Sequence, residues 1–300
     1  MNPILPPGVW LYLSGGVVLP PMAHSTTNTF ITTMTTPLRL LLLSALLIAL
    51  AACDRNELPT EADDVPLPPE ATPAPVAMTA FPEPYDFGNP ELTLKSFKNG
   101  AWDFDIVSEQ YRLGVATPDA DNLNCANSEK GQHIHLIYNN DPYLAKYESE
   151  FQEDAPDGEH YITAFLSRSY HLSLKAPASG IGKKVTVTNN SITKMEDITE
   201  PMLIYSRPKG TYTGKDTENV LLDFYLHNVD LSSGNYSVQV MVNGEYQFST
   251  GKWQPYYLQN LPMGKNTVTL TLLDGDGNVV DTPLNPVSRD FTLMAETPVN

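Results

Sequence analysis

Short runs in which hydrophobic and polar residues alternate dominate the sequence from about residue 90 onward. The clearest runs are 220–226, 236–242 and 267–272, and all three are rich in β-branched and aromatic residues. Turn-forming residues such as Asn243-Gly244 separate them. Successive side chains on a strand point to opposite faces, so this period of two indicates strands with one buried face. Many short strands separated by such turns predict an all-β sandwich fold.

The same order of strands and turns occurs twice. Each copy has a strand, an Asn-containing turn, an irregular strand, a Pro-x-Gly turn and a second strand, at 133–166 and again at 237–272. The repeat predicts two domains, 88–195 and 196–300. It also predicts which residues face each core, in matched pairs: Ile134 with Val238, Leu136 with Val240, Tyr138 with Val242, Ile162 with Val268, Ala164 with Leu270, and Leu166 with Leu272.

This duplicated pattern resembles the immunoglobulin-like domains of bacterial proteins. The resemblance implies two tandem immunoglobulin-like β-sandwiches, one in each copy. The chain has two cysteines, Cys53 and Cys125, so neither copy carries the cysteine pair of antibody domains. The resemblance is therefore to disulfide-free relatives, whose folds are held by their hydrophobic cores.

A secretion signal precedes the strands. Residues 34–52 begin at a methionine, carry one positive charge at Arg39, and continue in a short apolar run that ends in small residues. This run is too short to span a bilayer and is typical of a signal peptide. Its end, Leu50-Ala51-Ala52-Cys53, resembles the bacterial lipobox, which implies that Cys53 is acylated and becomes the mature N-terminus. Residues 1–33 contain no Lys, Arg, Asp or Glu, so we interpret them as a leader assigned upstream of the true start.

Residues 53–87 are rich in proline and acidic residues. Proline holds a chain extended and acidic repulsion keeps it open, so we expect a disordered linker between the lipid anchor and the folded part. The whole chain has a formal net charge of −17, which argues against nucleic acid as a partner. The expected partner is the lipid bilayer, held through acylated Cys53, and the expected location is the periplasmic or outer-membrane face of the bacterial envelope.

Histidines concentrate in the first copy. His133 and His135 are two residues apart on one predicted strand, so their side chains share the face opposite the core residues. Imidazole and thiolate groups that converge suit zinc or copper. The candidate ligands are His133, His135, His160, His171 and Cys125. The second copy carries Ser237, Gln239 and Asn266 at the positions of three of these histidines, so the fold itself does not require imidazoles there. The alternative is that the histidines are surface or turn residues with ordinary hydrogen bonds.

The stretch 125–143 together with 167–171 is similar to lipoproteins of Bacteroidota-type bacteria, some of which are described as phosphopeptide-binding. The forkhead-associated domains that read phosphothreonine use Gly-Arg, Ser-x-x-His and Asn-Gly motifs. Here Arg168 stands where that serine belongs, and no Gly-Arg precedes it. Arginine can grip a phosphate with two hydrogen bonds, so Arg168 and Arg207 are kept as candidate ligand-binding residues.

Aromatic residues give further candidates for recognition, because exposed Tyr and Trp favour contact with proteins or sugars. These are Tyr170, Trp253 and Tyr256. The sequence contains no Gly-x-Ser-x-Gly or His-Glu-x-x-His motif, and 274–278 resembles a hairpin turn rather than a calcium loop. The leading hypothesis is a non-catalytic binding lipoprotein with an unknown protein or glycan partner. Metal binding at the histidines and a structural spacer in an envelope complex are the alternatives.

Overall fold

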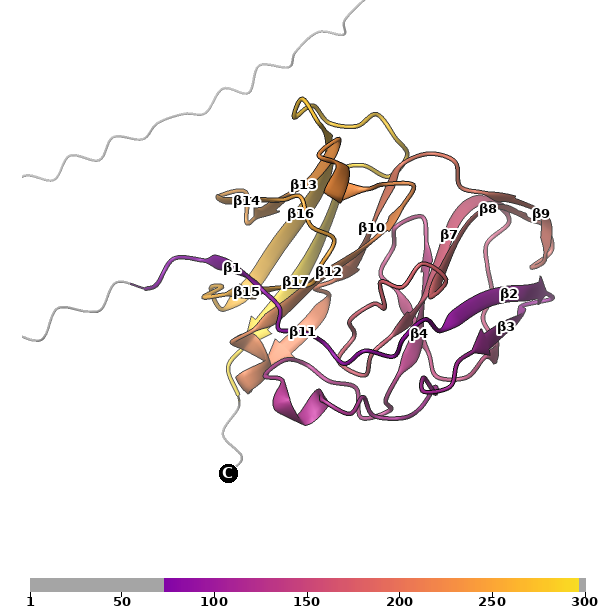
Figure 1. The fold of residues 1–300 in the computed structure, drawn as a ribbon, viewed down its shortest axis with the longest axis horizontal. Helices are drawn as coiled ribbons and strands as arrows, with labels where there is room; N and C mark the ends of the chain where they lie inside the picture. Colours follow the sequence, from indigo (N-terminus) through magenta and orange to yellow (C-terminus); the bar gives the residue numbers. More distant parts are fainter. Residues whose placement is uncertain (1–72, 297–300) are drawn as a thin grey trace, which may run out of the picture. The chain divides into compact units, whose positions relative to one another are not determined.

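The computed structural model describes residues 73–296, which form two β-sandwiches of mostly antiparallel strands (Figure 1). The all-β fold class predicted from the alternating pattern is confirmed. The proposed leader 1–33, the signal 34–52, the lipidation site Cys53 and most of the linker lie outside the described residues. In the part of the chain that is described, no helix is long and apolar enough to cross a lipid bilayer.

The first sandwich packs a three-stranded sheet against a five-stranded one. The smaller sheet has the order β2-β3-β6, with β2 at Glu91–Lys98, β3 at Ala101–Val107 and β6 at Glu150–Gln152. The larger sheet has the order β5-β4-β7-β8-β9, with β4 at His133–Tyr138, β5 at Leu144–Lys146, β7 at Gly158–Ser167, β8 at Gly180–Val187 and β9 at Ile192–Asp197. Trp102, Ile134, Leu136 and Ile162 are among the buried residues of the core between them.

The second sandwich has one four-stranded and one five-stranded sheet. The order β1-β15-β12-β10 joins β1 at Ala77–Ala80, β15 at Tyr256–Gln259, β12 at Val220–His227 and β10 at Met202–Arg207. The order β11-β17-β16-β13-β14 joins β11 at Gly210–Thr213, β17 at Val287–Met294, β16 at Gly264–Asp274, β13 at Tyr236–Val242 and β14 at Tyr246–Thr250. Short 3-10 turns lie at η1 (Ala120–Asn122), η2 (Gly214–Thr217) and η3 (Leu231–Ser233).

The internal repeat is confirmed at the level of single residue pairs. In the first copy Ile134 pairs with Leu166, and in the second Val238 pairs with Leu272. The turns also agree: Asn139 and Asn243 both have positive φ, and the side chain of each accepts a hydrogen bond from the backbone of the paired neighbouring strand, from Tyr161 of β7 and Thr267 of β16 respectively. Asparagine tolerates this left-handed conformation better than most residues. The same asparagine turn and the same side-chain hydrogen bond therefore connect the same pair of antiparallel strands in both copies.

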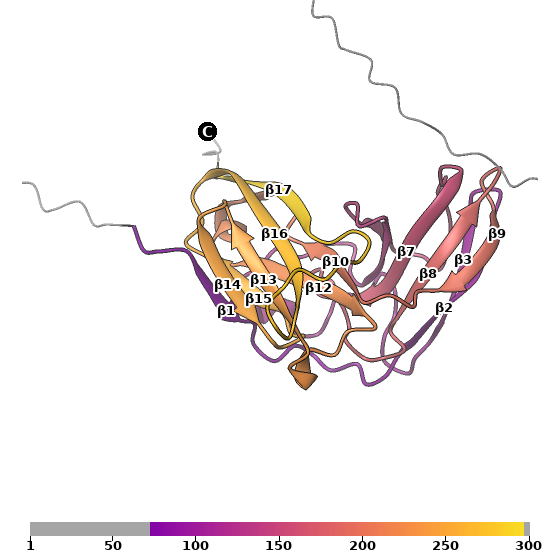
Figure 2. The same cartoon turned by 90° about the horizontal axis from the view of Figure 1, so that it is seen from above.

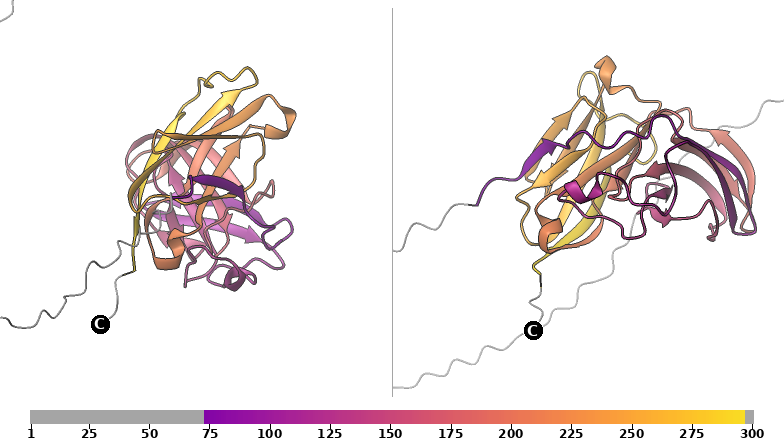
Figure 3. Two further views of the ribbon diagram at one scale, coloured as in Figure 1. Left: turned by 90° about the vertical axis from the view of Figure 1, so that its left-hand side faces the viewer. Right: turned by 60° about the horizontal axis from the view of Figure 1, so that its bottom comes forward.

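The linker prediction was wrong at its C-terminal end. Residues Ala77–Ala80 form β1, which pairs with β15 at the edge of the second sandwich (Figure 3). Val76 and Phe81, on either side of β1, are buried. The surrounding prolines and acidic residues made this segment resemble a linker. Proline is tolerated beside an edge strand, so these residues do not prevent pairing there. The chain therefore contacts the second sandwich before it enters the first.

The two sandwiches pack against each other through hydrophobic residues on the outer faces of their sheets. β10 and β12 lie between the rest of the second sandwich and the first (Figures 1 and 2). Phe165 of β7 stacks on Tyr225 of β12 with ring centroids 4.8 Å apart. Lys175 forms an ion pair across the junction with Asp223, at 2.6 Å between Nζ and Oδ1, and Asp223 is fully buried. Burial of Asp223 and of the two aromatic rings gives the junction a hydrophobic cluster of its own, separate from the cores of the two sandwiches.

The turn at 274–278 is a hairpin connection, in agreement with the sequence-based interpretation. The Asp274 carboxylate accepts hydrogen bonds from the backbone of Asp276 and Asn278. Both bonds go to Oδ1, and hydrogen bonds to this carboxylate hold the pKa of Asp274 below its usual value.

Candidate functional site: a buried cluster of three histidines

The site begins with two neighbouring positions on β4. Ile134 and Leu136 point into the core of the first sandwich, so the alternation of the strand directs His133 and His135 to the opposite face. Both histidines are 0% exposed. The tight turn after β7 supplies the third imidazole, His171, whose φ is +65°. This turn is closed by hydrogen bonds between the backbones of Arg168 and His171 and of Arg168 and Leu172.

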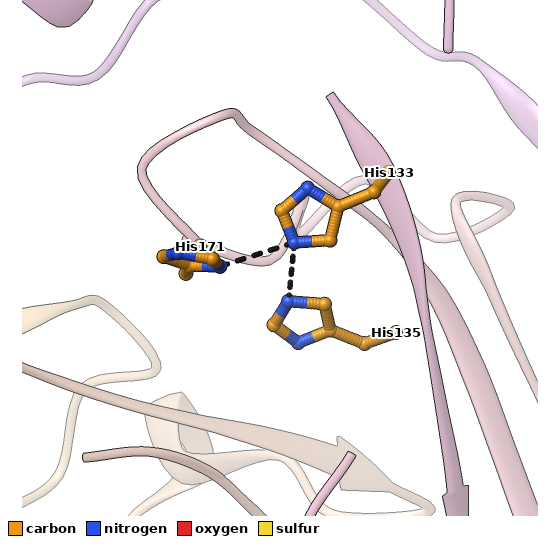
Figure 4. Close-up of side chains that lie close together, drawn as sticks. All are labelled: His133, His135 and His171. Atoms are coloured by element: carbon orange, nitrogen blue, oxygen red, sulfur yellow. Dashed lines mark hydrogen bonds between the residues drawn. The ribbon is translucent and has the colours of Figure 1, made fainter. Parts of the chain in front are cut away.

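The three rings bring one nitrogen each to a common point (Figure 4). His133 Nε2 lies 3.0 Å from His135 Nε2 and 3.1 Å from His171 Nδ1. All three nitrogen atoms lie within 4.8 Å of one another. A metal ion with bonds of about 2.0–2.1 Å holds its nitrogen ligands about 3.3–3.6 Å apart, so small movements of the rings would suit one ion.

Hydrogen bonding fixes which nitrogen of His133 carries its proton. Its Nδ1 lies 2.8 Å from the carbonyl oxygen of Gly131, which can only accept. Nδ1 therefore donates, and Nε2 presents a lone pair to the centre of the cluster. His135 has an oxygen partner of its own on the outer side, Ser206 Oγ at 3.3 Å from Nδ1. Oxygen partners at the outer nitrogens are the arrangement that orients metal-binding imidazoles.

Aromatic rings enclose the cluster. The Tyr143 ring stacks on His135 with centroids 3.5 Å apart and planes at 7°, and its hydroxyl lies 3.2 Å from His171 Nδ1. The Tyr147 ring lies 5.0 Å from that of His133. Tyr147 and His171 are only partly buried, whereas His133 and His135 are fully buried.

Burial and nearby cations keep the imidazoles neutral. Burial lowers the pKa of His133 to about 4, and the cations Arg207 and Lys209 act in the same direction. The pKa values of His135 and His171 are well below the usual value, with burial again the largest cause. Neutral imidazoles have free lone pairs near pH 7, as metal coordination requires.

Two of the predicted metal ligands lie outside this cluster. His160 donates from Nε2 to the carbonyl oxygen of Pro156 at 2.8 Å and accepts at Nδ1 from Asn139 at 2.9 Å. Asn266 makes the equivalent hydrogen bonds in the second copy, with Pro262 and Asn243. His160 therefore has a structural role in stabilising this turn. Cys125 is buried among hydrophobic residues, and burial raises the pKa of its thiol to about 11. Including His160 and Cys125 among the candidate metal ligands was wrong, because the type of a side chain does not reveal where the fold places it.

For His133 and His135, the alternative that they are surface residues was wrong. Their face of β4 does turn away from the core, but the second sandwich covers it with Ser206, Arg207 and Lys209. The covering strand β10 is buried along its whole length, and its pairing with β12 skips Ser206 at a bulge. The run 202–205 is hydrophobic without alternation, which is the sequence signal of a strand buried on both faces. That signal could have identified the covered face.

The five candidate ligand-binding residues are held by contacts within the protein. Four of them are at most 7% exposed: Arg168, Tyr170, Arg207 and Tyr256. The Arg168 guanidinium donates to the Tyr85 and Ser173 carbonyl oxygens, and the Tyr170 hydroxyl donates to Asp119. Trp253 is partly buried and donates from Nε1 to the Phe224 carbonyl oxygen. The proposed exposure of Tyr256 was wrong, because its ring belongs to the core of the second sandwich.

No family model matches this chain, and no curated protein matches it either. Among solved structures it has a distant likeness to the fibronectin(III)-like modules of Clostridium thermocellum CbhA, at 14% identity over 70% of this chain and 98% of that chain, with a TM-score of 0.26. The extracellular domain of the putative hybrid two component system BT3049 from B. thetaiotaomicron matches at 11% identity over 65% and 37%, with a TM-score of 0.26. The Bacteroides ovatus protein SGBP-B, solved in complex with a mixed-linkage heptasaccharide, matches at 8% identity over 74% and 71%, with a TM-score of 0.17. Similarities this distant place the chain in no family.

Proposed function

We propose that this chain is a non-catalytic, lipid-anchored protein of the bacterial cell envelope that binds one zinc or copper ion at His133, His135 and His171. The observation that carries the proposal is the convergence of three ring nitrogens within 4.8 Å in a buried site. The anchor and the location come from the lipobox-like sequence at Cys53.

A structural hydrogen-bond network explains this arrangement less well. His133 Nε2 offers one lone pair, yet two ring nitrogens lie at hydrogen-bonding distance from it. If the Tyr143 hydroxyl donates to His171 Nδ1, that nitrogen carries no proton, and its 3.1 Å contact with the unprotonated Nε2 of His133 is not a hydrogen bond. A cation at the centre uses all three lone pairs at once.

The test is elemental analysis and titration with zinc and copper of the full chain purified in detergent. We expect one metal ion per chain. Binding should fall to background in the variant His133→Ser/His135→Gln, which installs the side-chain types found at the same positions of the second copy. His171→Asn is the second variant, because asparagine tolerates the positive φ of that position.

The matched control is His160→Asn, which replaces a histidine of the same domain by its counterpart from the second copy. It should bind metal as the wild type does. Circular dichroism must show that each variant keeps its fold. Absence of metal above background in the folded wild type would refute the proposal.

A second candidate function is ligand binding in a pocket of about 420 Å³ beside the junction of the sandwiches. It is lined by two aromatic rings, Phe87 and Trp253, and by polar side chains that include Glu83, Asp86 and Gln254. A volume in this range suits a small ligand. A glycan array probed with the wild type and Gln254→Ala tests it: binding that is lost in the variant supports the pocket, and equal binding by both contradicts it.

A further inference from the structure

The three-histidine site differs from a typical zinc centre in its charge. Within residues 73–296, the set of side chains that converge on this point consists of three histidines, with no carboxylate and no thiolate. The ligand set is therefore neutral, and it offsets none of the charge of a bound ion. A divalent ion held by this set keeps its full charge of +2.

Two cations lie beside the site. The Cζ atom of Arg207 lies 5.3 Å from the centroid of the Tyr143 ring that stacks on His135, and Lys209 lies over the same ring. Arg207 is buried, and its Nε has no hydrogen-bond partner among residues 73–296. Lys209 Nζ is 3.8 Å from the centroid of the Tyr143 ring and donates to the Tyr143 carbonyl oxygen.

Charge has an unequal effect on ions of different valence. Repulsion from a fixed cation is proportional to the charge of the bound ion, so a divalent ion is repelled about twice as strongly as a monovalent one. The penalty for leaving water grows as the square of the charge, so it is about four times larger for a divalent ion. Both effects are strongest in a buried site such as this one, where His133 and His135 are 0% exposed.

We propose that the site selects monovalent copper, Cu(I), over divalent zinc; this inference rests on the metal-binding function proposed above. Cu(I) has a filled d shell and accepts three imidazole nitrogens without a fourth ligand. Zinc in proteins is almost always four-coordinate. The Tyr143 hydroxyl lies 3.2 Å from His171 Nδ1, and an uncharged hydroxyl is a poor fourth ligand for zinc.

The experiment compares affinities for Cu(I) and Zn(II) on the full chain in detergent. Cu(I) is measured without oxygen against a chromogenic chelator, Zn(II) against a fluorescent chelator, and Ag(I) serves as a monovalent ion that is stable in air. We expect Cu(I) to bind at least about 100-fold more tightly than Zn(II), with Ag(I) also ahead of zinc.

The variant Lys209→Met tests the cause, because it removes one positive charge and keeps an unbranched side chain of similar length. It should raise the affinity for Zn(II) by about the square of the factor by which it raises that for Cu(I). Lys265→Met is the control, since Lys265 is exposed and is not among the charges that act on the histidines. It should change neither affinity.

The outcomes separate this inference from the function on which it rests. Zinc binding as tight as Cu(I) binding overturns the selectivity and leaves the metal site intact. An equal shift of both affinities in Lys209→Met refutes the electrostatic cause. If neither ion binds to the folded wild type, the proposed function fails and the inference fails with it.

Discussion

The two copies of the repeated pair of antiparallel strands both bury their inner face in a core. Their outer faces differ, because that of the first copy is buried and that of the second is partly exposed. In the first copy, His133, His135, Ile137, Thr163 and Phe165 on β4 and β7 are all buried. Their counterparts in the second copy are Ser237, Gln239, Met241, Thr269 and Thr271 on β13 and β16, and the first four of these are only partly buried. The difference arises because the sheet β1-β15-β12-β10 of the second sandwich covers the first copy, while no sheet formed by residues 73–296 covers the second.

This difference shows how a duplicated fold acquires a site. The inner face is constrained by the core and keeps the same hydrophobic pairs in both copies. The outer face is free to change, and once a second layer covers it, polar residues there must find partners or lose free energy. In the first copy those partners are other imidazoles. A buried histidine cluster is therefore a product of domain packing rather than of the sandwich fold.

The largest effect we expect in stability concerns His227, which packs on the covered face. Its Nε2 lies 2.9 Å from Thr163 Oγ1, and burial lowers its pKa to about 4. The folded protein keeps His227 neutral, whereas the unfolded chain takes up a proton near the ordinary pKa of about 6.5. The stabilising contribution is therefore complete above pH 6.5 and is lost as the pH falls toward 4, by about 3 kcal/mol.

Urea denaturation at pH 7.5 and pH 4 measures this contribution. The variant His227→Gln cannot titrate, so it should lose about 3 kcal/mol less than the wild type over this range. The histidine cluster is common to both proteins and cancels in the difference. Equal losses in the two proteins would mean that His227 is not held neutral by the junction.

Sequence reasoning predicted the repeated part of the molecule well and the packing between the copies poorly. Alternation located β4, β13 and β16, and the repeat gave the pairing of Ile134 with Leu166. It also placed His133 and His135 on one face. It could not reveal that Ser206 and Lys209, more than sixty residues away, close that face, because such contacts depend on how two sheets dock. The short hydrophobic stretches around Val76 and Phe81 were missed because the neighbouring prolines and acidic residues suggested a linker.

The next prediction tests the claim that His160 and Asn266 do the same work in the two copies. Asn266 is fully buried, donates to the Pro262 carbonyl oxygen at 2.8 Å and accepts from Asn243 at 2.8 Å. Asn266→Ala should lower the free energy of unfolding by about 1–3 kcal/mol, because it leaves these groups without partners. Asn266→His should cost less than about 1 kcal/mol, since histidine can restore both bonds. Both variants are measured by urea denaturation. Equal losses of stability would mean that histidine cannot replace Asn266 and that His160 and Asn266 have different roles.

The smallest effect is expected when the first copy's histidines are placed on the second copy. Ser237→His/Gln239→His changes two partly buried positions on an uncovered face, so the free energy of unfolding should change by less than about 0.5 kcal/mol. Two imidazoles on one strand face can still meet an ion, but no third histidine, no stacked tyrosine and no covering sheet accompany them. In the background His133→Ser/His135→Gln, titration should therefore show weaker copper binding than the wild type. Wild-type affinity there would mean that two histidines on any strand suffice and that the covered junction contributes nothing to the site.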